Sequence, residues 1–385
     1  MRPLSLAVMT AVLAIGCVGE PRSRPRTVRR TVSETIGRDL IARAEAIVSR
    51  LESGEAAPEH CEYAAASLGG LAAAVPPRAA EAEYLHARVL HACGRADDAE
   101  RALRRALALS PSNVPALAMA ARFARYEGRL DEADRLARRA LSIEPSSVDG
   151  ALELSAVLRE RTGTQSLAEA ERLLLVALRS STDRADVHNA LAAVYLAQAA
   201  WSPQRLELAT AACRRGADAD PSFGPIHTTW GQVELRKGNA TRAGARFQMA
   251  MDLDRRALEP RLAFGSLSVA LGAYEEARGA LEEAIRIAGP RPVRRGLAYD
   301  ANVYLAVAFR GLERDPEARS VLQRARDIDP ERPEAYFHLG QIAAGSGSPA
   351  EARENLQSFL ERAGDPEARS GALDEARRLL GQVSP

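Results

Sequence analysis

Proline recurs along this chain at a fixed interval, and that interval constrains the fold more than any other feature of the sequence. Pro111 ends the stretch LALSP, and Pro145 ends the stretch LSIEP 34 residues further on. Aligned on these prolines, glycine recurs at Gly94 and Gly128, each followed by alanine and large apolar residues at matching offsets. A period of about 20 to 50 residues is typical of stacked units that share a continuous core. The chain is therefore expected to form a linear array.

Eight copies of this pattern extend from about residue 80 to residue 365. Each copy contains two helix-length segments in which apolar residues are three or four positions apart, as on one face of a helix. Glycine separates the two segments, and proline often follows the second, where a new helix must begin. The third and fourth copies carry insertions near Gly163 and Trp201, and the stretch GPRPVRRG precedes the seventh.

The pattern resembles that of tetratricopeptide repeats over residues 80–365, about three quarters of the chain. The resemblance implies an all-α fold, a right-handed α-solenoid of about eight helix pairs. Small residues, such as Gly231, Gly265 and Gly340, occupy positions where the paired helices would approach closely. Residues 32–79 are expected to form an atypical helix pair, and residues 366–385 a capping helix, because an open-ended array needs a polar outer face.

An apolar run near the N-terminus indicates export. Arg2 precedes the run from Leu4 to Ile15, which is too short to span a bilayer. Gly16 separates the run from Cys17, and this order resembles the lipobox of bacterial lipoproteins, although Ala14 stands where that pattern has a leucine-like residue. The resemblance implies a signal peptide over residues 1–16 and lipid attachment at Cys17. An ordinary secretory signal is the alternative.

Residues 17–31 are rich in arginine and proline, which favours an extended tether between the lipid and the array. Val18 differs from the aspartate associated with inner-membrane retention in enteric bacteria. The lipoprotein resemblance therefore favours an envelope protein anchored at the outer membrane and facing the periplasm. No later apolar segment approaches 18 residues, so no membrane span is expected beyond the lipid anchor.

Neither the composition nor the motifs indicate catalysis. The net charge of +1 does not favour a nucleic-acid partner. The sequence lacks a G-x-S-x-G elbow, an H-E-x-x-H zinc motif and a phosphate-binding G-x-x-x-x-G-K loop. We therefore expect a protein that is not an enzyme and has no catalytic residue, cofactor or metal.

Cys61 and Cys93 are expected to lie close together. In the repeat frame, Cys61 is near the start of one second helix and Cys93 near the end of the next first helix, and antiparallel stacking would bring these ends together. A disulfide in an oxidising periplasm is one interpretation. A zinc site with His60 and His91 is the other, although the spacing matches no established metal motif.

The resemblance also assigns a partner-binding surface, because the first helix of each pair lines the inner, concave face of such arrays. The corresponding positions here are rich in arginine and tyrosine at first and more apolar later: Tyr84, Arg88, Arg122, Arg125, Tyr126, Arg159, Asn189, Gln232, Leu235, Arg236, Leu262, Val269, Val303, Val307, Arg310 and Phe337. Arginine favours carboxylates, and apolar walls favour an amphipathic segment. An acidic or amphipathic peptide segment of a protein partner is therefore expected. The alternative is that these arginines only make the array soluble.

Together these features predict a lipid-anchored periplasmic scaffold that assembles or stabilises an envelope complex. A pilus or secretion pore, outer-membrane protein assembly and gliding-motility machinery all remain open. The alternative is a docking regulator of a cell-wall hydrolase or synthase. The lysine and asparagine set with which chaperone-binding repeats hold a C-terminal carboxylate is absent.

Overall fold

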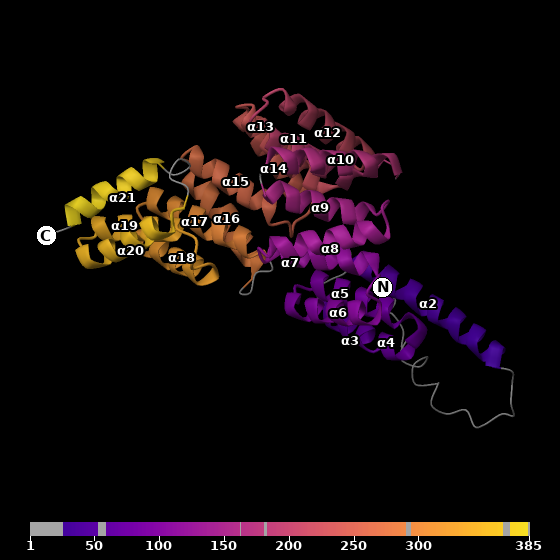
Figure 1. The fold of residues 1–385 in the computed structure, drawn as a ribbon. Coiled ribbons are helices and arrows are strands. Elements are labelled where there is room, and N and C mark those ends of the chain that lie inside the picture. The colour runs from indigo at the N-terminus through magenta and orange to yellow at the C-terminus, as the bar shows by residue number, and fades with distance from the viewer. Residues whose placement is uncertain are drawn as a thin grey trace. The chain divides into compact units, whose positions relative to one another are not determined.

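A computed structural model describes residues 26–52, 59–161, 163–180, 183–289, 294–364 and 370–383, and these ranges form helices without any strand (Figure 1). The expected signal peptide, Cys17 and most of the expected tether lie outside the described residues. None of the described helices is both long and apolar enough to cross a membrane. The chain divides into two compact units. Unit 1 comprises Met1–Phe123 and Arg135–Pro145, and unit 2 comprises Ala124–Asp134 and Ser146–Pro385.

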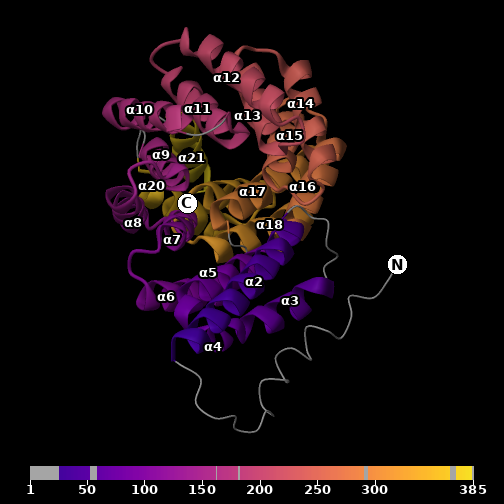
Figure 2. The same cartoon turned by 90° about the vertical axis from the view of Figure 1, so that its right-hand side faces the viewer.

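Unit 1 begins with a long helix that precedes the repeats and packs against the first of them. Its elements are α2 (Arg26–Glu52), α3 (Glu59–Gly69), α4 (Leu71–Ala74), η1 (Pro76–Arg78), α5 (Ala79–Ala92) and α6 (Ala96–Leu109), together with most of α7 (Val114–Tyr126) and α8 (Leu130–Ile143). Both α2 and α3 pack against α5 (Figure 2). Leu117 of α7 is buried with Ala140 of α8.

The start of α2 corrects two expectations about the N-terminal part. The helix begins at Arg26, so residues 26–31, expected in the extended tether, are helical. Pro25 is the last proline before residue 58, and a run without proline permits an uninterrupted helix. The segment expected as one helix pair over residues 32–79 instead contains α2, α3, the short α4 and the single turn η1.

Unit 2 continues as successive helix pairs. Its helices are α9 (Val148–Glu160), α10 (Thr164–Ser180), α11 (Ala185–Gln198), α12 (Arg205–Ala219), α13 (Gly224–Arg236), α14 (Ala240–Leu253), α15 (Glu259–Ala270), α16 (Tyr274–Ala288), α17 (Arg295–Gly311), α18 (Asp315–Ile328), α19 (Glu334–Gly345), α20 (Pro349–Arg362) and α21 (Ser370–Val383). Each odd-numbered helix from α9 to α19 packs on the helix that follows it, and also on the next odd-numbered helix. The last helix, α21, buries Leu373 and Ala376 against α20.

In three of these pairs, a glycine on the first helix lies under a large apolar side chain of the second helix. A Cβ atom added to Gly265 would lie 2.5 Å from Cγ of Leu281, which is fully buried. Gly231 lies in the same way under Phe247, and Gly340 under Leu356. The prediction that small residues permit close approach is confirmed at these three positions.

The turn within six of the pairs, α5–α6, α7–α8, α13–α14, α15–α16, α17–α18 and α19–α20, places one residue in the left-handed backbone region. At Gly272 φ is +73°, and the next residue, Ala273, donates from its N–H to the carbonyl oxygen of Ser268 at 2.8 Å. This hydrogen bond satisfies a carbonyl at the end of the helix. Glu313 occupies the corresponding turn of the α17–α18 pair with φ of 59°, although it has a Cβ atom.

Replacing Glu313 with glycine is expected to stabilise unit 2. A non-glycine residue in the left-handed region costs roughly 1 kcal/mol or more, and glycine removes most of this strain. The Glu313→Gly variant should have a higher thermal unfolding midpoint than the wild type. Glu313→Ala retains the Cβ atom, so an equal rise in that variant would exclude backbone strain as the cause.

Adding one methyl group to the α15–α16 contact should destabilise unit 2. The Gly265→Ala variant forces Leu281 out of its position, at an expected cost of about 1 to 3 kcal/mol. Gly279, within α16, has no atom within 4 Å of an added Cβ. Gly279→Ala should instead stabilise the helix by up to about 1 kcal/mol. Urea unfolding of both variants tests the difference, and equal effects would contradict it.

Candidate partner-binding surface

All the predicted contact residues lie on odd-numbered helices, from α5 to α19. Leu262 and Val303 are each only 8% exposed and belong to the hydrophobic core around α15 to α19. For these two residues the prediction of an open contact position is wrong, because they pack within the array. Phe337 is half-buried, and its ring centre lies 5.0 Å from that of Phe359.

The most open of the predicted positions are on α13. Gln232 and Arg236 are exposed, and within the described ranges neither side chain forms a hydrogen bond or an ion pair. Asn189 on α11 is half-buried, and its Oδ1 atom is buried with no hydrogen-bond partner in the described part of the chain. Among the predicted aliphatic positions, Leu235, Val269 and Val307 keep partial exposure. A partner could therefore reach both polar and apolar groups.

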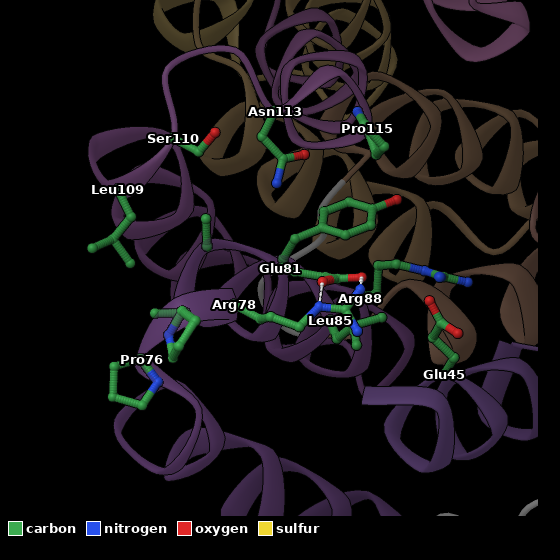
Figure 3. Close-up of a pocket in the computed structure, with 14 residues that line it drawn as sticks. Glu45, Pro76, Arg78, Glu81, Leu85, Arg88, Leu109, Ser110, Asn113 and Pro115 are labelled. Atoms are coloured by element: carbon green, nitrogen blue, oxygen red, sulfur yellow. Dashed lines mark hydrogen bonds and ion pairs between the residues drawn. The ribbon is translucent and has the colours of Figure 1, made fainter. Parts of the chain in front are cut away.

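Unit 1 contains a pocket of about 630 Å³ that includes two predicted residues, Tyr84 and Arg88 of α5 (Figure 3). The guanidinium carbon of Arg88 is 5.8 Å from the centre of the Tyr84 ring. An ion pair between Arg78 and Glu81, with N and O 2.6 Å apart, forms part of the wall. The remaining lining includes Glu45, Pro76, Pro77, Leu85, Leu109, Ser110, Asn113 and Pro115. The pocket thus offers both charge signs beside an apolar surface, which suits side chains of an amphipathic segment.

Several predicted arginines are occupied by contacts within the array. Arg125 donates to Glu160 at 2.8 Å and to Glu153 at 3.5 Å. Burial acts to lower the pKa of Arg125, but Glu153, Tyr126 and Glu160 together raise it above the ordinary value. Arg310 donates to Gln341 at 2.6 Å. These two arginines are therefore bonded within unit 2, and Arg122 and Arg88 also have partners.

Arg294 is a residue of this surface that the sequence analysis missed. It donates from Nη2 to the hydroxyl oxygen of Tyr126 at 3.0 Å, across 168 residues of sequence, and also pairs with Glu259. It lies in the insertion before α17, outside the repeat pattern, so the period gave no signal for it.

Cys61 and Cys93 are joined by a disulfide in the structure, with their Cα atoms 5.5 Å apart. The bond connects α3 with the end of α5 and uses both thiols that the zinc interpretation required. Among the described residues, no group of three or more histidine, cysteine, aspartate or glutamate side chains is arranged to hold a metal ion. Cys213 is buried, and this burial raises the pKa of its thiol to about 12.

Removing the disulfide should destabilise unit 1. The cysteines are 32 residues apart, and a loop of that size gives an expected loss of about 3 to 4 kcal/mol by chain entropy. The Cys61→Ser, Cys93→Ser variant should therefore unfold at lower denaturant than the oxidised wild type. Reductant should shift the wild type similarly, and intact mass after alkylation reports whether the bond was present. A wild type that alkylates fully without reductant would contradict the bond.

Residues 262–333 and 305–369 match the family model described as tetratricopeptide repeat. This part of the chain contains tetratricopeptide repeats. The structure of yeast Tom70 is similar at 14% identity and a TM-score of 0.56, covering 98% of this chain and 78% of Tom70. A tetratricopeptide repeat protein from Parabacteroides merdae ATCC 43184 is 14% identical, with a TM-score of 0.43, covering 70% of this chain and 98% of that one. Pseudomonas aeruginosa pilF is 19% identical, with a TM-score of 0.41, covering 58% of this chain and 94% of that one.

The likeness to Tom70 shows a shared fold, an all-α solenoid of paired helices. No curated protein is detectably similar in sequence. The tetratricopeptide repeats indicate a scaffold for protein–protein interaction.

Proposed function

We propose that this chain is a lipid-anchored scaffold of the bacterial cell envelope, which binds a protein partner through its odd-numbered helices and thereby assembles or stabilises an envelope complex. The observation that carries the proposal is the pair Gln232 and Arg236 on α13. Both side chains are exposed, and neither bonds to another described residue. Most other arginines of the array are bonded to neighbouring side chains. Gln232 and Arg236 are therefore available for contact with a partner.

Two features support the location in the envelope. The N-terminal sequence has the order of a lipoprotein signal, ending before Cys17. The disulfide between Cys61 and Cys93 fits an oxidising compartment such as the periplasm, because cytosolic thiols are normally kept reduced. We propose lipid attachment at Cys17, with the array facing the periplasm from the outer membrane.

The proposed partner presents an acidic or amphipathic segment. Arg236 on α13 supplies an exposed cation, and the pocket around Tyr84 in unit 1 supplies apolar surface beside charged groups. Charged side chains fix the position of such a segment, and apolar anchors provide most of its burial.

Cross-linking in the native envelope, followed by mass spectrometry, tests this proposal. The test variant is Gln232→Ala, Arg236→Glu, which reverses the exposed charge on α13. The control is Arg242→Glu on α14, which reverses an exposed charge on the paired, even-numbered helix. We expect one set of cross-linked partners to be lost from the α13 variant and kept in the control. Partners unaffected by the α13 variant would contradict binding through this surface.

The same experiment with Cys17→Ser tests the anchor. We expect this variant to leave the membrane fraction and to lose the partners that the α13 variant also loses. Recovery of Cys17→Ser with the membrane at the wild-type level would contradict lipid attachment at this residue. If the partners are cell-wall hydrolases or synthases, the result would favour a docking regulator of those enzymes over an assembly scaffold.

A further inference from the structure

The outer side of α10 in unit 2 exposes apolar side chains to solvent. The helix buries one stripe of apolar side chains, which are three or four positions apart: Leu167, Ala170, Leu174 and Ala177. The side away from such a stripe is normally polar. On α10 that side instead carries Leu175 and Val176, which are 36% and 45% exposed.

The exposed apolar residues continue onto α12. Both helices pack on α11 (Figure 1), and Arg205 of α12 pairs with Glu171 of α10, with N and O 3.0 Å apart. Leu175 lies about one turn after Glu171, and Leu208 about one turn after Arg205. Because residues one turn apart lie on the same face of a helix, the ion pair brings the segments that carry these two leucines together. Leu208 is exposed, like Leu175.

Trp201 adds an aromatic ring at the loop between α11 and α12. It is 55% exposed, although tryptophan is a large apolar residue. Three residues earlier, Gln198 donates to Glu171 of α10 at 2.9 Å, so this end of α11 lies against α10. We refer to Leu175, Val176, Trp201 and Leu208 as the outer apolar surface.

The exposed charges on α10 are all positive. Its exposed positions include two arginines and no carboxylate: Thr164, Gln165, Ala168, Arg172, Leu175, Val176, Arg179 and Ser180. Arg172 and Arg179 form no hydrogen bond or ion pair within the described ranges. These two guanidinium groups are therefore available beside Leu175 and Val176.

The charges on α12 also favour an anionic partner. Arg214 and Arg215 are exposed and have no hydrogen bond or ion pair among the described residues. Glu207 pairs with Lys237 at 2.8 Å, which leaves Asp218 as the one carboxylate of α12 without such a bond in the described part of the chain. Positive charges exceed negative ones on α10 and α12 even when the paired groups are counted.

We propose that the outer apolar surface lies on a membrane surface that contains anionic lipid. Aliphatic and tryptophan side chains enter the boundary between headgroups and acyl chains, and the arginines beside them bind lipid phosphates. A lipid surface requires no shape complementarity, and these residues lie on the outward sides of two helices. A second copy of this chain fits less well, because a twofold contact would bring Arg172 and Arg179 against the same residues of the other copy.

This inference goes beyond the proposed function, because it concerns even-numbered helices, and it rests on the proposed location at a membrane. A lipid at Cys17 would hold the chain close to the bilayer. Weak binding by a second surface is then effective, since the anchor raises its local concentration.

Vesicle binding by the purified Cys17→Ser chain tests this surface without an attached lipid. The probes are vesicles of phosphatidylglycerol with phosphatidylethanolamine, and vesicles of phosphatidylcholine alone. We expect tryptophan emission to shift to the blue on the anionic vesicles only, and added salt to reverse the shift. The chain has two tryptophans, so Trp201→Phe assigns the shift by removing it. Binding through the arginines of residues 17–31 alone would sediment the chain without this shift.

Charge reversal on α10 tests the role of its arginines. Arg172→Glu, Arg179→Glu should weaken binding to the anionic vesicles about tenfold or more, because each arginine near the lipid surface contributes several-fold. The matched control is Arg242→Glu, Arg324→Glu, which makes the same charge change at exposed, unbonded arginines of the described helices α14 and α18. The control should weaken binding by about twofold at most.

Leu175→Gln, Val176→Gln retains the charge and should abolish the blue shift, as should Leu208→Gln on α12. Thermal midpoints show which variants remain folded. Equal loss of binding in the test and control charge variants would attribute binding to net charge and overturn the proposal. Emission of Trp201 that anionic vesicles leave unchanged would also overturn it.

Two further outcomes would assign the outer apolar surface to another occupant. Self-association that Leu175→Gln, Val176→Gln abolishes would assign it to a second copy. A protein cross-linked in the native envelope and lost in that variant, without vesicle binding, would assign it to a protein partner. Failure here is distinguishable from failure of the proposed function, because the cross-linking test depends on Gln232 and Arg236 of α13 and the vesicle test uses the chain without lipid.

Discussion

The close approach of the two helices in each pair is the interaction on which unit 2 depends. At the α15–α16 pair, the absence of a side chain at Gly265 lets Leu281 lie directly on the backbone of the first helix. This contact buries Leu281 completely and fixes the spacing of the two helix axes. Gly231 and Gly340 make the same kind of contact, so these three pairs approach equally closely, and pairs of this kind can stack on one another. The surface of the odd-numbered helices is a consequence of this stacking.

Stacking places residues about one repeat apart beside each other, and several arginines use this to bond to the next repeat. Arg125 reaches Glu160, 35 residues later, and Arg310 reaches Gln341, 31 residues later. The even-numbered helices do the same, since Arg319 of α18 pairs with Glu351 of α20. Those of these pairs that are largely exposed contribute little each. Their effect on the binding surface is larger, because an arginine already bonded to the next repeat is not free to bind a partner.

The period, the helix pairs and the small residues at their contacts could be predicted from the sequence because they depend on local patterns and a fixed spacing. The partner of Arg125 could also have been found, since Glu160 lies almost one period away. The contact between Arg294 and Tyr126 could not, because it joins residues 168 apart and depends on the accumulated curvature of several repeats. The burial of Leu262 and Val303 likewise depends on how neighbouring repeats fit together.

The distribution of unsatisfied groups separates the arginines of this surface into two kinds. Arg125 and Arg310 have acceptors within the array and help to hold adjacent repeats together. Arg159 has none in the described part of the chain, and burial makes its charge unfavourable. Gln232 and Arg236 on α13 are exposed and also lack a bonded partner in the described part of the chain, so they are the polar part of this surface that another molecule can reach.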